Sequence, residues 1–147
     1  MAEKHNDVLQ CLSEIFMSEM AGVMRYLHYS FMIMGHNRIP IQKWLRDKAT
    51  EGVDHATIIG EKITALGGHP PMEQVKIEES NVHTVNAILN ESLSFERHGL
   101  DLYKKLVKLA VSHDDIALEE LARDFVRQET EHLEEVEKML HSDGGKK

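Results

Sequence analysis

The sequence has little of several residue types, and each shortage excludes a class of protein. A single cysteine, Cys11, occurs among 147 residues, so no disulfide can form within the chain. There are only three prolines, and helix-forming residues are plentiful, which favours helix over sheet. No apolar run approaches the ~20 residues that a membrane-spanning helix requires.

Positive charge is also in short supply. Lys and Arg total 17 against 25 Asp and Glu, which gives a net charge of −8. Nucleic acid is therefore not an expected partner, because phosphate binding requires clustered positive charge. The polar N-terminus lacks the apolar segment of a secretion signal, and together with the lone cysteine this predicts a cytoplasmic protein.

Apolar residues make up 41% and charged residues 29% of the chain, a balance that predicts one globular domain over residues 1–147. Apolar positions recur at threes and fours, and we find no internal repeat. Breaks rich in Gly, Pro, Ser and Asp separate the helical segments. The predicted helices cover residues 6–34, 41–66, 81–112 and 115–141, followed by a flexible tail over 142–147.

The connections between these helices are short, long and short. Short connections join antiparallel neighbours, and the long one can run the length of a bundle. The sequence therefore predicts an all-α, antiparallel four-helix bundle with one long crossover between the second and third helices. Two separate helical hairpins are the alternative arrangement.

Each apolar stripe contains ionisable residues where an apolar residue is expected. A buried charge is costly unless it is paired or binds a metal. At ~1.5 Å per residue, these side chains lie at nearly the same level, about 20–24 Å from one end of the bundle. Carboxylates and imidazoles in one layer suit iron or manganese, whereas hydrogen-bonded pairs without a metal are the alternative. The residues are Glu19, His55, Glu96, Glu129 and His132.

Several motifs in these segments resemble the bacterioferritins, a family within the ferritin-like group that also includes the rubrerythrins. The similarity extends over roughly residues 4–142 and includes the segment lengths. It implies oxidation of Fe(II) by O₂ or peroxide, and storage of the ferric product in a hollow shell. The matching motifs are Ser18-Glu19-Met20-Ala21 with Tyr26, Asp54-His55-Ala56, Ala65 to Pro70, Phe95-Glu96, and Glu129-Thr130-Glu131-His132.

The resemblance also implies roles for individual residues. Glu19 and Glu96 are terminal carboxylates, and Glu129 bridges two metals. His55 and His132 each bind one metal, while Tyr26 is a neighbour of the site. With Tyr26, the three carboxylates form the expected catalytic set. Iron is the expected metal, with manganese or zinc as alternatives.

Two positions in the second helix depart from the family pattern. The family has Glu-x-x-His there, but Gly52 stands three residues before His55. Glu51, four residues before His55, lies about 40° round on roughly the same face. We include it among the metal ligands, with a surface position as the alternative. Val53 occupies the position of the family's haem-ligating methionine, so no haem is expected.

Three functions remain open at this point. The first is an iron-storage or detoxification protein with ferroxidase activity, weakened by Gly52. The second is a rubrerythrin-like peroxide reductase served by a separate electron donor. The third is a degenerate, non-catalytic subunit that assembles with an active paralogue. We expect a homodimer, with a larger shell less certain because the chain ends soon after the fourth helix. We assign the other histidines to the surface or the ordinary core: His28, His83, His98 and His113.

Overall fold

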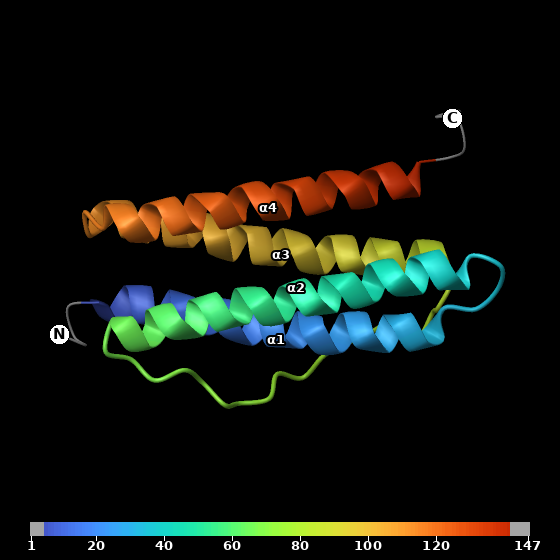
Figure 1. Ribbon diagram of the computed structural model, residues 1–147, viewed down its shortest axis with the longest axis horizontal. Helices are drawn as coiled ribbons and strands as arrows, with labels where there is room; N and C mark the ends of the chain where they lie inside the picture. The colour runs from blue at the N-terminus through green and yellow to red at the C-terminus, as the bar shows by residue number, and fades with distance from the viewer. Residues whose placement is uncertain (1–4, 142–147) are drawn as a thin grey trace.

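The computed structural model describes residues 5–141, and the predicted tail over 142–147 lies outside this range. The described chain folds into four long helices and contains no strand, so the all-α prediction is confirmed (Figure 1). The helices are α1 (Asn6–Met32), α2 (Arg38–Ala65), α3 (Val85–Ser112) and α4 (Ile116–Leu140).

The helix boundaries differ from the predicted ones by up to four residues. α3 begins at Val85 rather than at 81, because the Thr84 side chain caps it by accepting a hydrogen bond from the amide of Ala87 at 3.2 Å. α2 begins three residues early, with Pro40 in its first turn, where a missing N–H costs nothing. α1 ends at Met32, two residues early, and Gly35 turns the chain with φ of 98°.

The helices form two antiparallel hairpins, α1–α2 and α3–α4, packed against one another (Figure 1). The connection over residues 66–84 leaves the end of α2, runs along the α1–α2 hairpin and reaches the start of α3 at the opposite end of the bundle. α1 is the element that contacts both α2 and α3. No helix in residues 5–141 is long and apolar enough to cross a membrane.

Apolar side chains fill both ends of the bundle. One end is packed around Leu12, Ile59 and Leu106, and the other contains Leu45 and Ile88. The layer between these clusters holds the buried ionisable residues, so the polar site sits at mid-height with hydrophobic packing above and below it. This packing fixes the helix positions and thereby the positions of the polar side chains.

Candidate metal centre

Three carboxylates and two imidazoles converge at mid-height in the bundle. Glu19 comes from α1, His55 from α2, Glu96 from α3, and Glu129 and His132 from α4. Glu96 and Glu129 are only 7% and 3% exposed, and His55 is 6% exposed. The sequence-predicted layer therefore exists as a cluster of side chains that line one small pocket.

The five side chains form two overlapping groups that share Glu129. Glu19, His55 and Glu129 offer ligand atoms within 4.8 Å of one another, and so do Glu96, Glu129 and His132. A carboxylate between two such groups can contact two cations at once, whereas each outer glutamate can contact only one.

The two imidazoles are oriented alike. The Nδ1 atom of His55 lies 3.8 Å from Oε1 of Glu129, and the Nδ1 atom of His132 lies 3.7 Å from the same oxygen. Their Nε2 atoms face outward partners. Nε2 of His55 lies 3.0 Å from Oε1 of Gln128, and Nε2 of His132 lies 3.3 Å from Oε2 of Glu51. Partners on the outer nitrogen fix the ring orientation and leave Nδ1 directed at the centre.

Glu51 is therefore brought to the site, but through His132. Its side chain is about half exposed and also lies 3.2 Å from Nζ of Lys48. Gly52 faces α1, where an added Cβ would lie 2.9 Å from a methyl group of Val23. Close packing of α1 on α2 thus means that a side chain at the position where the family pattern has a carboxylate would require Val23 to shift.

Each outer glutamate is held by a tyrosine from the other hairpin. Tyr103 of α3 donates a hydrogen bond to Glu19 at 2.7 Å, and Tyr26 of α1 donates a short one to Glu96. These two bonds join α1 to α3 at the level of the site. Tyr26 was expected here from the sequence, whereas Tyr103 was not.

The two tyrosines belong to an internal repeat that the sequence reading missed. Residues 19–26 read EMAGVMRY and residues 96–103 read ERHGLDLY, both with Glu, Gly and Tyr at the same places. The same offset of 77 positions, as 96 is after 19, relates His55 to His132. The shared Glu-x-x-Gly-x-x-x-Tyr spacing was a signal that could have identified Tyr103 as a site residue.

The same offset pairs Glu51 with Gln128, and these two residues have matching contacts to the outer nitrogens. Gln128 in turn donates a hydrogen bond to Asp124 at 2.8 Å, which fixes its amide. Neither Gln128 nor Asp124 was predicted as part of the site, because neither is an ionisable residue that interrupts an apolar stripe.

Burial and mutual repulsion shift the protonation of the carboxylates in the absence of metal. Burial, with Glu129 as neighbour, raises the pKa of Glu96 well above its ordinary value. Burial acts in the same direction on Glu129, but interactions with Glu96 and His132 outweigh it and lower its pKa. Within the pair, the pKa of Glu96 is therefore the higher, so Glu96 takes up a proton at a higher pH than Glu129.

Glu51 and His132 behave as an ion pair. The hydrogen bond with His132 lowers the pKa of Glu51 to about 2. Burial opposes charge on His132, but Glu129 and Glu51 outweigh it and raise its pKa to about 9. His132 is therefore protonated at neutral pH and pairs with the carboxylates of Glu51 and Glu129.

The residues present suit a pair of first-row transition-metal ions. Oε2 of Glu129 is buried without a hydrogen-bond partner in the described chain, although such an orphaned oxygen is costly. Carboxylate oxygen and imidazole nitrogen are donors that iron, manganese and zinc accept. A metal at this oxygen would remove the cost of leaving it unpaired.

A carboxylate–imidazole cluster inside a four-helix bundle with one long crossover is the arrangement of the ferritin-like class. The comparisons agree, because residues 9–143 match the family model of the ferritin-like domain. The chain belongs to the ferritin-like domain family.

Individual relatives are distant in sequence. The bacterial non-heme ferritin of Bacteroides fragilis is 23% identical over 120 residues, which cover 82% of this chain and 76% of that protein. A ferritin-like, diiron-carboxylate protein from Bacillus anthracis superposes with a TM-score of 0.89 at 22% identity, covering 96% of this chain and all of that one. The bacterioferritin of Rhodobacter capsulatus superposes with a TM-score of 0.82 at 19% identity, covering 92% of this chain and 84% of that one. These structures share the fold with this chain.

Proposed function

We propose that the protein binds two Fe(II) ions in the bundle and oxidises them, as an iron-storage or detoxification ferroxidase. The observation that carries the proposal is Glu129, a buried carboxylate shared by two ligand groups, with one oxygen left unpartnered. Fe(II) is the substrate here, and O₂ or peroxide accepts its electrons.

Each residue has a role in this proposal. Glu129 bridges the ions, Glu19 and His55 hold one of them, and Glu96 and His132 hold the other. The negative charge of the three glutamates favours the ferric products, because more positive charge is stabilised as the ions are oxidised. Tyr103 and Tyr26 orient the outer glutamates.

Protons must leave as the ions enter. A histidine ligates only as the neutral ring, and Glu96 offers both oxygens only as the carboxylate. His132 therefore releases its proton on binding, while Glu51 accepts a hydrogen bond from its Nε2 and keeps Nδ1 directed inward. Glu51 acts in this scheme as a positioning residue rather than as a ligand.

A second function, a non-catalytic or single-metal subunit, is favoured by one specific observation. Gly52 leaves α2 without the carboxylate that its counterpart Glu129 supplies in α4, so the two metal positions share one carboxylate instead of two. A chain of this kind binds metal without rapid oxidation and functions through assembly.

The deciding experiment is an anaerobic Fe(II) titration of the metal-free protein, followed by admission of O₂. Two ions bound per chain, with a ferric signal that rises much faster than in buffer, would support the ferroxidase. One ion or none, with oxidation at the buffer rate and an intact fold by circular dichroism, would support the subunit. Peroxide consumption without a ferric core would indicate a peroxide reductase instead.

Self-association is proposed through the outer face of α1. Met20 and Met24 are 44% and 65% exposed there, and with Met72 of the crossover they line one surface groove. Clustered exposed apolar side chains favour pairing with a second copy. Sedimentation velocity should give a dimer or larger species that Met24→Glu shifts toward monomer; an unchanged distribution would contradict this interface.

A further inference from the structure

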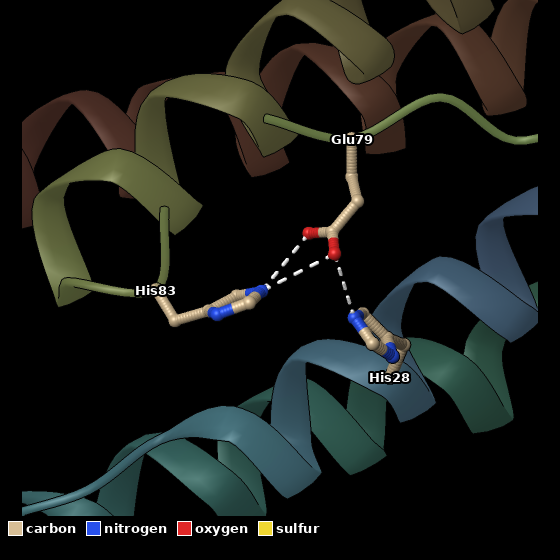
Figure 2. Close-up of side chains that lie close together, drawn as sticks. All are labelled: His28, Glu79 and His83. Carbon is tan, nitrogen blue, oxygen red and sulfur yellow. Dashed lines mark hydrogen bonds and ion pairs between the residues drawn. The ribbon is translucent and has the colours of Figure 1, made fainter. Parts of the chain in front are cut away.

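A second cluster of metal-ligating side chains lies on the surface, away from the bundle centre. Figure 2 shows His28 of α1 and His83, just before α3, with one imidazole nitrogen of each directed at the carboxylate of Glu79. Both histidines had been assigned to the surface or core without a partner. Sequence spacing could not reveal the cluster, because Glu79 and His83 lie outside any helix.

The distances within the cluster are short. Nε2 of His28 lies 3.0 Å from Oε1 of Glu79, and Nε2 of His83 lies 3.2 Å from each oxygen of that carboxylate. One ligand atom from each of the three residues lies within 4.8 Å of the others. In a tetrahedral site with bonds of ~2.0–2.1 Å, neighbouring ligand atoms are roughly 3.3 Å apart. Small side-chain rotations would therefore admit an ion.

Groups outside the cluster hold the loop in shape. Arg25 donates a hydrogen bond to the carbonyl of Glu78 at 3.0 Å, and the amide of Ser80 donates one to Glu91 at 2.7 Å. These contacts anchor the crossover to α1 and α3 on either side of Glu79. The position of the carboxylate thus depends on contacts that do not involve the histidines.

The backbone then turns so that His83 faces Glu79. Asn81 adopts φ of 60°, a left-handed conformation that asparagine tolerates better than most residues, and the amide of Val82 donates to Oγ of Ser80 at 3.2 Å. The chain therefore bends between the two side chains. Two ligands from one shaped loop and a third from a rigid helix make a preorganised site.

The geometry points to a surface site for a divalent first-row transition metal, held by His28, Glu79 and His83 and tying the crossover to α1. Two imidazoles and one carboxylate are a donor set that zinc accepts, with water in the remaining position. The side chain of His28 is 45% exposed, so solvent reaches the cluster. A carboxylate with two neutral imidazoles carries a net charge of −1, which attracts a dication.

The test is zinc binding to the full-length protein, measured by equilibrium dialysis and by Co(II) absorption. His83→Gln and Glu79→Gln should each lose one zinc per chain or bind it at least about tenfold more weakly, because even groups that only support a ligand change affinity ~10–100-fold. His98→Gln, which alters an exposed histidine in α3, is the matched control and should keep the wild-type stoichiometry.

Glu129→Gln separates this site from the bundle centre. The surface zinc should remain in Glu129→Gln and should slow hydrogen exchange over residues 78–84 there, but not after His83→Gln. Loss of all zinc in Glu129→Gln, or unchanged zinc binding in both His83→Gln and Glu79→Gln, would overturn the proposal. His28→Gln, at an exposed position, provides the same comparison should a loop variant fail to fold.

Discussion

The two hairpins of this bundle use the same plan, yet they contribute unequally to the centre. α1 and α3 each supply Glu, Gly and Tyr at equivalent places, and α2 and α4 each supply a histidine. The difference at the centre is one position, where α4 has Glu129 and α2 has Gly52. A site that could have had two central carboxylates therefore has one, which both imidazoles face.

The physical reason lies in how closely the helices pack. A Cβ at Gly52 would lie 2.9 Å from Val23, so α1 and α2 meet where a carboxylate would have to stand. The two residues that contact the outer imidazole nitrogens differ less. Glu51 and Gln128 each accept a hydrogen bond from an imidazole, but only Glu51 is charged. The unmatched negative charge therefore comes from α4 at the centre, through Glu129. At the rim, where Glu51 and Gln128 contact the outer imidazole nitrogens, it comes from α2, through Glu51.

Glu129→Gln should have the largest effect, since it removes the carboxylate that both halves share. We expect tight binding of both ions to be lost in an anaerobic titration with Fe(II) or Co(II). Glu51→Gln, the matched variant at the rim, should retain both ions, with affinity reduced by ~10–100-fold at the His132 side only. Retention of two tightly bound ions in Glu129→Gln would refute the shared-ligand assignment.

Giving α2 the missing carboxylate tests whether the asymmetry limits activity. Gly52→Glu alone should lower the free energy of unfolding by ~1–3 kcal/mol, because its Cβ would lie 2.9 Å from a methyl group of Val23, which would have to shift. Combined with Val23→Ala, it should fit and raise the rate of O₂-dependent Fe(II) oxidation, followed by stopped-flow absorbance. Gly52→Gln with Val23→Ala controls for volume without charge; an equal rate in both would mean that the glycine does not limit oxidation.

The two tyrosines should prove equivalent. Tyr26→Phe and Tyr103→Phe each leave a buried carboxylate short of one donor, which costs about 1–3 kcal/mol. Urea unfolding of the metal-free protein measures both losses. A lower free energy of unfolding in only one variant would show that the two tyrosines contribute unequally to stability, although the sequence motif repeats.

The smallest expected effect is the pH dependence of the rim. His132 has a pKa raised from 6.5 to about 9, so its contribution to stability is fully present below 6.5 and is lost as the pH rises through about 9. Because Glu51 is half exposed, the change should be about 1 kcal/mol or less. Chemical unfolding of metal-free protein at pH 6 and pH 9.5 measures it, and Glu51→Gln should reduce the difference. An equal pH dependence in wild type and Glu51→Gln would argue against this pair as its source.

The sequence predicted the bundle and its polar layer because both follow from helical periodicity. Glu19, His55, Glu96, Glu129 and His132 interrupt apolar stripes, and a stripe is visible without a structure. Gln128 could not be found in this way, since its role depends on an imidazole from another helix. Glu51 was ambiguous because a half-exposed carboxylate looks the same in sequence whether it faces solvent or a histidine.

Loop geometry was the other feature that could not be predicted from the sequence. The start of α3 depends on the cap at Thr84, and the contact of Glu79 with His83 depends on the left-handed turn at Asn81. Neither feature is periodic. Helix periodicity therefore located the buried centre, whereas the surface cluster required coordinates.

No Cα atom of α2 lies within 8 Å of one of α4 in the described bundle, so side chains alone span that side. At mid-height the spanning contacts include those of His55 with Gln128 and Glu129, and that of Glu51 with His132. An ion held by His55 of α2 and Glu129 of α4, as proposed above, would therefore also join these two helices. Removing the metal should therefore make α2 easier to separate from α4, and separating the two helices should weaken metal binding.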